Sequence, residues 1–348
     1  MAVVFVAPLV GFYFFLIRSV DRYAPEPWWL VVCCLVWGAF GSILLASVGN
    51  FLGMEAIAAV LGRTSDDELV THATATIVAP LIEEPAKALG LVAIYLFARR
   101  RVYEAHGPLS GMVYGGMIGL GFTFTEDISY IVAGAEAAGG AGFVGLLMVR
   151  TILLGFGHAT FTAMTGLGFG LFVTMRSGWR WLMPVAGLAG GMVFHAGRNL
   201  FASFLMGEGI GLIFVLLLHF MVIGLFFALL VWLGLRDRKR VMLGLSEMVG
   251  VLITREEYDR IISPWLLLPG WNLFSLMGLP GGYFAARRKQ LNLFKLAFIR
   301  HRQRHEPIDP AQPPVIDPVE NEAIAAIQQA NHEGVYLAPY PPAGAGVR

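Results

Sequence analysis

Seven apolar stretches, each close to the length of a membrane-spanning helix, make up most of the first 240 residues. They lie at 1–17, 28–49, 72–97, 109–133, 150–175, 181–205 and 210–235. About 20 apolar residues in a helix cross the hydrocarbon core of a bilayer, and a helix satisfies its own backbone hydrogen bonds there. The chain is 57% hydrophobic and 14% charged, whereas soluble domains usually contain ~25% charged residues. The sequence therefore predicts an all-α, polytopic membrane bundle of about seven transmembrane helices.

The basic residues between these stretches predict the orientation of the bundle. The loops at 18–27, 98–108, 176–180 and 236–240 hold eleven arginines and lysines, while the three intervening loops hold only Arg63. Cytoplasmic loops of membrane proteins carry such an excess of positive charge. We therefore expect the N-terminus outside and the C-terminus in the cytoplasm. The near-neutral net charge of +1 gives no reason to expect a nucleic-acid partner.

The character of the chain changes after Arg240, so we predict a transmembrane bundle over 1–240 followed by two further segments. Thr254 and Glu257 have the spacing of a capping box. Residues 264–284 are apolar but are interrupted by prolines and glycines, and a crossing there would export the basic run that follows. We therefore predict cytoplasmic interfacial helices over 241–305, in contact with the lipid bilayer, and a mostly disordered tail over 306–348.

Nine of the ionisable residues inside the apolar stretches are candidates for a buried site, since a charge at the bilayer centre costs roughly 2.5–3.5 kcal/mol. They must face one another, water or a substrate. They are Glu83, Glu84, Lys87, Glu126, Asp127, Arg150, His158, His195 and Arg198. From its place near a helix end we expect Arg150 to extend toward the membrane surface, and we expect Asp127 and Arg198 to pair with each other.

The depths of four of these ionisable groups and of Asn199 agree with a single buried site. With a rise of about 1.5 Å per residue, Glu83 and His195 fall near mid-membrane. Glu126, His158 and Asn199 fall in the outer half. Within the helices, residues four apart share a face, which pairs Glu83 with Lys87 and His195 with Asn199. We expect these side chains to converge on one cavity.

Carboxylates and imidazoles in an apolar pocket can catalyse a hydrolysis reaction. A carboxylate with a raised pKa can act as general base on a water molecule, and Glu83 or Glu84 is the natural candidate. The imidazoles of His158 and His195, or a metal, would stabilise the oxyanion. His158, His195 and Glu126 would also make a His, His, carboxylate set that could bind a catalytic zinc ion. A self-neutralising structural cluster of Glu83, Glu84 and Lys87 is the plainer alternative.

Four strings, one in each of four successive apolar stretches, carry a resemblance to a known family. APLIEEPAK (79–87), GFTFTEDISY (121–130), FGHATFTAMTG (156–166) and FHAGRN (194–199) resemble the PrsW family of intramembrane proteases over about 70–235. That family is related to the CAAX prenyl proteases and their bacterial Abi relatives. Those relatives have arginine at a shifted spacing where this chain has Lys87, and Glu126 stands where they have a histidine. These departures fit the PrsW branch.

The resemblance implies an intramembrane peptidase in the plasma membrane of a bacterium. Glu83, Glu84 and His158 match positions expected to be essential, with Glu126, His195 and Asn199 in the same cavity and Lys87 in support. The family's best-known role is the first, outward-side cut in a single-span anti-sigma factor. Whether the family mechanism uses a metal or a glutamate-activated water stays open.

Two other classes of function also remain open at this point. A secondary transporter would bury ionisable groups at mid-membrane as well, although such proteins usually show inverted repeats, which this sequence does not. A non-catalytic receptor or immunity-type membrane protein would keep the fold and lose a motif residue. The motifs do not indicate the substrate, the cleavage position or the oligomeric state.

Overall fold

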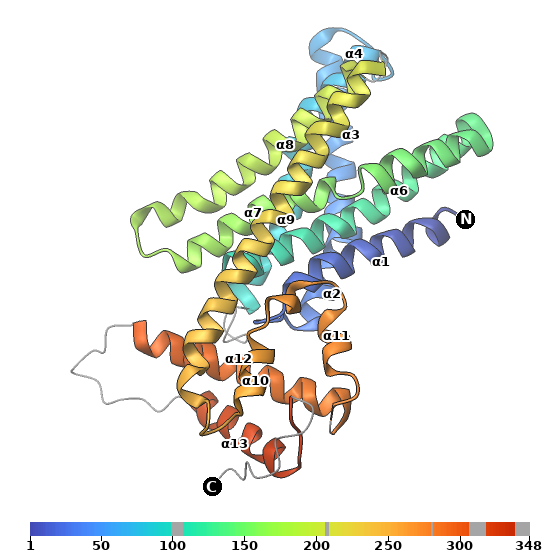
Figure 1. The fold of residues 1–348 in the computed structure, drawn as a ribbon. Coiled ribbons are helices and arrows are strands. Elements are labelled where there is room, and N and C mark those ends of the chain that lie inside the picture. Colours follow the sequence, from blue (N-terminus) through green and yellow to red (C-terminus); the bar gives the residue numbers. More distant parts are fainter. Residues whose placement is uncertain (99–106, 206–208, 280, 306–317, 338–348) are drawn as a thin grey trace. The chain divides into compact units, whose positions relative to one another are not determined.

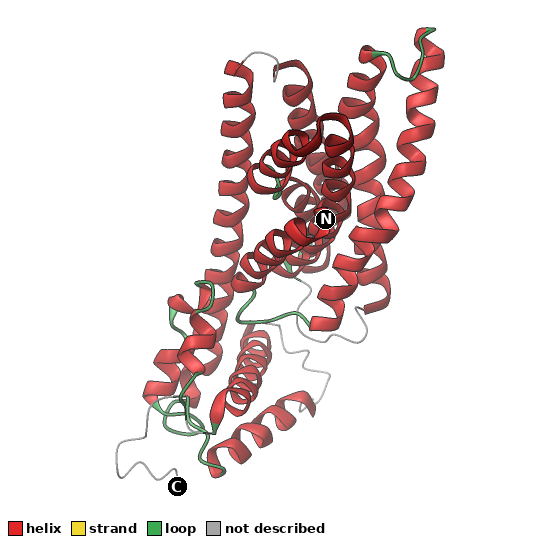
Figure 2. Ribbon diagram, turned by 90° about the vertical axis from the view of Figure 1, so that its right-hand side faces the viewer, coloured by secondary structure: helices red, strands yellow, loops and turns green. Residues whose placement is uncertain are grey.

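The computed structural model describes residues 1–98, 107–205, 209–279, 281–305 and 318–337. Within these ranges all regular structure is helical, and the one β-type contact is an isolated bridge between Val249 and Ile253. The chain forms two compact units (Figures 1 and 2). The first contains Met1–Arg18 and Glu26–Leu230, and the second contains Ser19–Pro25 and the chain from Val231 onward.

The first unit has a helix at each of the seven predicted apolar stretches. Its helices are α1 (Ala2–Val20), α2 (Trp28–Val36), η1 (Trp37–Ser42), α3 (Ile43–Leu61), α4 (Glu68–Ala73), η2 (Thr74–Val78), α5 (Ala79–Ala93), η3 (Ile94–Ala98), α6 (Pro108–Leu146), η4 (Leu147–Leu153), α7 (Gly157–Thr174), η5 (Gly178–Leu182), α8 (Met183–Leu205) and α9 (Gly209–Leu245), which continues into the second unit.

Four helical segments of the described chain are long and apolar enough to cross a membrane. They are Ala2–Val20, Trp28–Leu61, Pro108–Thr174 and Leu216–Met248. The protein is therefore a multi-pass membrane protein in its composition and fold, while the count of seven crossings and the orientation stay predictions. Three arginines that contributed to the predicted orientation, Arg99, Arg100 and Arg101, lie outside the described residues.

A helical hairpin in α6 was not foreseen. Ala138 and Gly139 leave the helical conformation, and Gly139 has φ 59°, which glycine adopts without steric cost. The chain reverses there (Figure 1, green), and the return leg packs against the outgoing leg where Gly142 meets the backbone of Gly134. The return leg continues through η4 and stops before α7. Arg150 therefore lies on this return leg and not at the end of a span.

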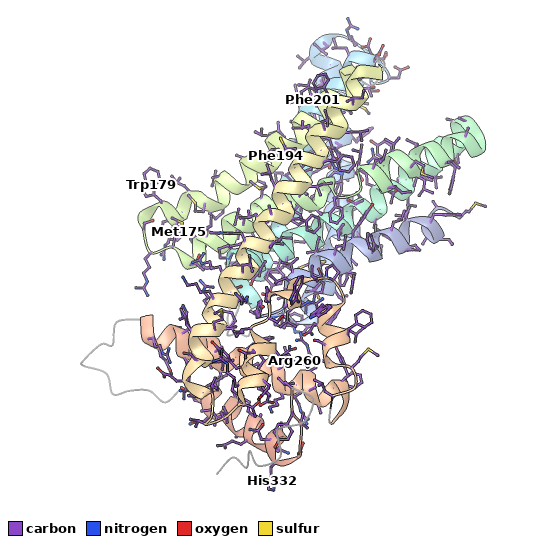
Figure 3. All side chains as sticks on the ribbon, viewed as in Figure 1. Met175, Trp179, Phe194, Phe201, Arg260 and His332 are labelled. Carbon is purple, nitrogen blue, oxygen red and sulfur yellow. The ribbon has the colours of Figure 1, made fainter. Side chains whose placement is uncertain are left out.

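Glycines set the spacing of the three helices that carry most of the site. On α6, Gly111, Gly115 and Gly119 each lie directly against the backbone of α7, and on α8 Gly187 and Gly191 do the same. A methyl group at any of these positions would overlap a neighbouring backbone atom. Small residues allow this close approach of membrane helices. Figure 3 shows the side chains on this framework, with Trp179 in the η5 turn between α7 and α8.

The second unit is built from short helices after α9. They are η6 (Ser246–Met248), α10 (Arg255–Ile261), η7 (Pro264–Leu267), α11 (Trp271–Leu276), α12 (Gly282–His305) and α13 (Pro318–His332). The predicted capping box is confirmed: Thr254 Oγ1 accepts from the Glu257 amide at 3.2 Å, and Glu257 Oε2 accepts from the Thr254 amide at 3.0 Å. Residues 264–284 are not one helix, because Gly270, Gly278 and Gly282 have positive φ.

The prediction of a mostly disordered tail is wrong for residues 318–337. Residues 318–332 form α13, which packs against α12 and buries Ala323, Ile327 and Ala330. These three side chains recur every three or four residues and so form one apolar helix face. Proline and alanine content concealed this pattern in the sequence. Residues 306–317 and 338–348 lie outside the described residues.

Candidate active site

Four helices of the first unit bring the sequence-predicted site residues together. α5 supplies Glu83, Glu84 and Lys87, α6 supplies Glu126, α7 supplies His158, and α8 supplies His195 and Asn199. Glu83, Glu84, Lys87, His158 and His195 are all buried, with exposed fractions between 0% and 4%. The convergence expected from their depths in the sequence is therefore confirmed as geometry.

The backbone around the two glutamates departs from a regular α-helix. Thr74–Val78 forms a π-helical turn, and the helix that follows contains Pro80 and Pro85. Pro85 has no amide hydrogen to donate to the carbonyl of Leu81, which loosens that turn. Asn199 Nδ2 donates to the carbonyl oxygen of Ala75 at 2.8 Å, so α8 is tied to the π-helical turn. π-helical turns often occur at functional sites.

Lys87 is the central cation of the site. Its Nζ lies 2.8 Å from Glu84 Oε1 and 3.4 Å from Glu83 Oε2. It also lies 3.0 Å from His158 Nδ1 and 3.8 Å from the centre of the Phe122 ring. A buried ammonium needs this number of partners, because leaving water costs several kcal/mol.

The two adjacent glutamates have different surroundings. Both oxygens of Glu84 accept hydrogen bonds. In addition to the bond from Lys87, Glu84 accepts from Thr162 Oγ1 at 3.2 Å and from His195 Nδ1 at 3.0 Å. Glu83 has a hydrogen bond from Asn50 Nδ2 at 3.1 Å and the longer contact with Lys87, and it also lines a cavity. Glu83 is therefore the carboxylate with capacity for a further ligand.

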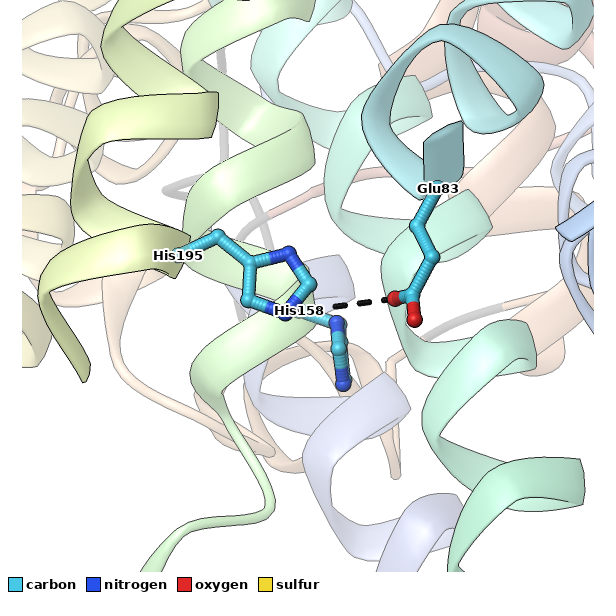
Figure 4. A group of neighbouring side chains, drawn as sticks. All are labelled: Glu83, His158 and His195. Atoms are coloured by element: carbon cyan, nitrogen blue, oxygen red, sulfur yellow. Dashed lines mark ion pairs between the residues drawn. The ribbon is translucent and has the colours of Figure 1, made fainter. Parts of the chain in front are cut away.

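Hydrogen bonds define the tautomer of each histidine. Because the Lys87 ammonium can only donate, His158 Nδ1 is the acceptor and Nε2 carries the proton, which it donates to Glu126 Oε2 at 2.7 Å. Because the Glu84 carboxylate only accepts, His195 carries its proton on Nδ1. The other ring nitrogen of His195, Nε2, lies 3.9 Å from Glu83 Oε2. Figure 4 shows the two groups facing each other.

Aromatic rings hold the imidazoles in these positions. The His195 ring stacks on Phe161 with centroids 5.3 Å apart and 16° between the planes. The His158 ring meets His195 edge-on at 5.0 Å and lies beside Phe122 at the same centroid distance. The site residues are thus oriented by packing as well as by hydrogen bonds.

A cavity of about 480 Å³ opens onto this network. Its wall combines apolar residues with hydroxyl, amide and charged groups, and the polar members are Ser47, Asn50, Thr71, Thr74, Glu83, Glu126, Ser129, Tyr130, Arg150, Arg198 and Asn199. A second cavity of about 210 Å³ is lined by His158 and shares Arg150, Arg198 and Asn199. Extended backbone has unpaired polar groups in a membrane, and such a wall can satisfy them.

Comparison with known proteins adds the family to this geometry. Residues 26–232, more than half of the chain, match the PrsW family intramembrane metalloproteases. The chain belongs to the PrsW family. No curated protein and no solved structure matches it at a significant level. Membership of the PrsW family makes the protein an intramembrane metalloprotease in class.

The metalloprotease description of the PrsW family raises the question of which residues would hold a metal ion. One donor atom each from Glu83, His158 and His195 lies within 4.8 Å of the other two. Two imidazoles and one carboxylate are a known ligand set for catalytic zinc, so the donor chemistry fits. The sequence had placed Glu126 as the third ligand. In the structure Glu126 instead bonds His158 Nε2, which is the position of an outer partner of a metal-bound histidine.

Two sequence expectations for neighbouring charges need correction in this PrsW chain. Arg150 does not extend to the membrane surface, since it lies 2.9 Å from Glu126 and 3.3 Å from Asp127. Asp127 also accepts from Thr151 at 2.9 Å, so it pairs with the return leg of the hairpin and not with Arg198. Arg198 lies over the Phe161 ring at 5.2 Å and contacts Asn199 Oδ1 at 3.3 Å. The α6 hairpin, which the sequence did not reveal, brings Arg150 to Glu126 and Asp127.

Asn50 and Thr162 are site residues that the sequence reasoning missed. Asn50 lies on α3, outside the four motif stretches, and Thr162 lies one turn after His158 within the third motif string. An amide in an otherwise apolar stretch was the available signal for Asn50. Nothing distinguished Thr162 from the other hydroxyl residues of α7.

Proposed function

We propose that this PrsW-family protein hydrolyses a peptide bond of a membrane-spanning protein, with Glu83 as the general base. One observation carries the proposal: Glu83 Oε2, which lines the cavity, and His195 Nε2 face each other at 3.9 Å. In the neutral form of His195 both atoms are acceptors, and two acceptors at this separation favour a bridging donor or cation between them. A water molecule there would lie within reach of the base that deprotonates it.

The surrounding residues then have separate tasks in the proposed reaction. Glu83 takes the proton of the attacking water and passes it to the departing amine. Glu84 orients His195, and Lys87 balances the two carboxylates and holds His158 in its tautomer.

Glu83, His158 and His195 are the residues that would hold a metal ion in this site. A divalent metal bound there would polarise the peptide carbonyl and lower the pKa of a bound water. Glu84 and Glu126 would then serve as the carboxylate partners that fix the two ligating imidazoles. For His158 to bind a metal through Nδ1, the Lys87 ammonium must move away from that atom.

The substrate class follows from the predicted depth and orientation. The site residues are predicted to lie near mid-membrane or in the outer half, and the cavity wall has the polar groups that an unwound peptide segment requires. We propose a single-span protein cut toward its outer side in a bacterial plasma membrane, with an anti-sigma factor as the first candidate, as in the family's best-known role. The relation of this family to the CAAX prenyl proteases is part of the same proposal.

The test is cleavage of single-span reporters in proteoliposomes. Wild type, Glu83→Gln and the matched control Glu55→Gln are compared, since Glu55 is exposed on α3. We expect cleavage by wild type and Glu55→Gln and none by Glu83→Gln. Cleavage by a well-expressed Glu83→Gln protein at the wild-type rate would refute the role of Glu83.

A further inference from the structure

Six large apolar side chains are exposed on a short stretch of the second unit. They come from η7, α11 and the residues after them, and we call them the tryptophan patch: Trp265, Leu268, Trp271, Leu273, Phe274 and Met277. The rings of Trp265 and Trp271 lie 6.3 Å apart, and Phe274 is 70% exposed. Single exposed apolar residues are normal, but a group of this size marks a contact surface.

The opposite side of the same stretch is anchored inside the second unit. Leu266 and Leu267 of η7 and Leu276 of α11 are buried. The buried Asn272 accepts from Gln290 Nε2 of α12 at 3.0 Å. Arg260 of α10, labelled in Figure 3, donates to the carbonyl oxygen of Ser275 at 2.6 Å. The patch is therefore held on a fixed scaffold and does not result from a loose segment.

The helix that follows, α12, exposes a further apolar ring and positive charge on one of its faces. Phe284, in the first turn of α12, is 86% exposed. Arg288 and Lys295 are also exposed and lie four and eleven residues after Phe284, so all three share one face of the helix. The other face of α12 buries Leu293, Phe294 and Ala297. An apolar ring beside lysine and arginine is the composition of helices that lie on membrane surfaces.

We propose that the tryptophan patch and the Phe284–Arg288–Lys295 face bind an anionic lipid surface at the boundary between headgroups and acyl chains. Tryptophan has an apolar body and a polar N–H and is enriched at this depth. Exposed lysine and arginine are attracted to anionic headgroups. The candidate span Leu216–Met248 precedes the patch in the chain, which keeps a bilayer within reach. This inference does not depend on the proposed peptidase reaction.

Site-directed spin labelling of the full-length protein tests the proposal. Cys33 and Cys34 are replaced by serine, and single cysteines are introduced at Phe274 in the patch and, as control, at Gln328, which is exposed on α13. Both proteins are reconstituted into phosphatidylcholine vesicles with and without phosphatidylglycerol. Collision of the label with oxygen, which concentrates in lipid, is compared with collision with a water-soluble nickel chelate. Unchanged thermal unfolding shows that each variant is folded.

We expect the oxygen-to-nickel collision ratio to be several-fold higher at position 274 than at 328. The ratio should rise further with phosphatidylglycerol, and Arg288→Gln combined with Lys295→Gln should remove this rise. A water-like ratio at 274 would overturn the proposal. Protection of the label at 274 from both reagents would also overturn it, because the patch would then be covered by protein, such as a second copy of the chain.

Discussion

Each of the two units contains a fully buried lysine beside a glutamate, and only one of the two pairs belongs to a candidate active site. Lys87 and Lys289 are 0% and 1% exposed. Lys87 contacts Glu83, Glu84 and His158, and Lys289 contacts Glu257. The other neighbours of each lysine distinguish a catalytic cluster of buried charges from a structural one.

In the second unit, backbone groups complete the hydrogen bonding of Lys289 and Glu257. Lys289 Nζ donates to Glu257 and to the carbonyl oxygen of Val335 at 2.8 Å. Glu257 accepts from the amide of Leu337 at 2.9 Å and uses its second oxygen in the capping box of α10. Burial lowers the pKa of Lys289, and Glu257 opposes this shift. The pair therefore joins α10, α12 and residues 335–337, and both Glu257 oxygens are engaged.

The pair in the first unit differs because one carboxylate faces a cavity and two histidines are present. Glu84 is as fully hydrogen-bonded as Glu257, whereas Glu83 borders the cavity and faces Nε2 of His195. A buried lysine and glutamate alone are thus weak evidence for a site. The informative features are the acceptor that faces open space and the imidazoles around it.

Removing one carboxylate from each pair should produce the largest contrast. We expect Glu83→Gln to lower cleavage of a single-span reporter by about 100- to 10,000-fold, the usual contribution of a general base. Glu257→Gln should leave the cleavage rate unchanged, because it acts only on the second unit. Initial rates in proteoliposomes measure both, and equal losses in the two variants would remove the distinction.

Removing the lysines should destabilise both units but affect activity in only one. Lys87→Met and Lys289→Met each leave a buried carboxylate without its cation, a loss of about 3–5 kcal/mol when a buried pair is broken. Hydrogen exchange should show faster exchange of α5 amides in the first variant and of α10 and α12 amides in the second. Cleavage should be lost only in Lys87→Met. Loss of cleavage in folded Lys289→Met would contradict a purely structural role.

Metal content separates the two clusters by a measurement that needs no substrate. If Glu83, His158 and His195 hold an ion, purified wild type should contain about one metal per chain, and His195→Ala should contain at least tenfold less. His219→Asn is the control, since His219 is also buried but lies outside the three-residue group. Metal analysis of the purified proteins decides the question, and an active wild type free of metal would favour the glutamate-only mechanism.

The smallest effect is expected from the hydrogen bond that orients Glu83. Asn50→Ala removes the amide 3.1 Å from Glu83 Oε1, and hydrogen bonds to charged groups contribute ~1.5–3 kcal/mol. We expect about a tenfold lower cleavage rate with little change in unfolding temperature. Ser47→Ala is the matched control, because the Ser47 hydroxyl lines the same cavity but bonds only the Ile43 carbonyl in its own helix. Equal rates for the two variants would exclude Asn50 as a positioning residue.

Most of the helices and most of the site could be predicted from local patterns. Apolar length located the helices of the first unit, and the rarity of charge in such stretches selected Glu83, Glu84, Lys87, His158 and His195. The α6 hairpin escaped prediction because it depends on two residues, Ala138 and Gly139, within a glycine- and alanine-rich run that has no other turn signal. The pairing of Arg150 with Glu126 and Asp127 follows from that hairpin.

The sequence by itself determined that this chain is a helical membrane protein and which residue types its site contains, because a charge in an apolar helix is too costly to be incidental. Only the tertiary structure decided which partners, and therefore which role, each of these groups has. In the folded protein Glu84 has a hydrogen-bond partner at each oxygen, whereas Glu83 faces the cavity and His195. Glu126 bonds His158 Nε2, on the side of the ring away from Lys87. Hydrogen-bond partners from α3, α7 and α8 make that difference, and no local pattern around Glu83 and Glu84 specifies which helices will pack beside them.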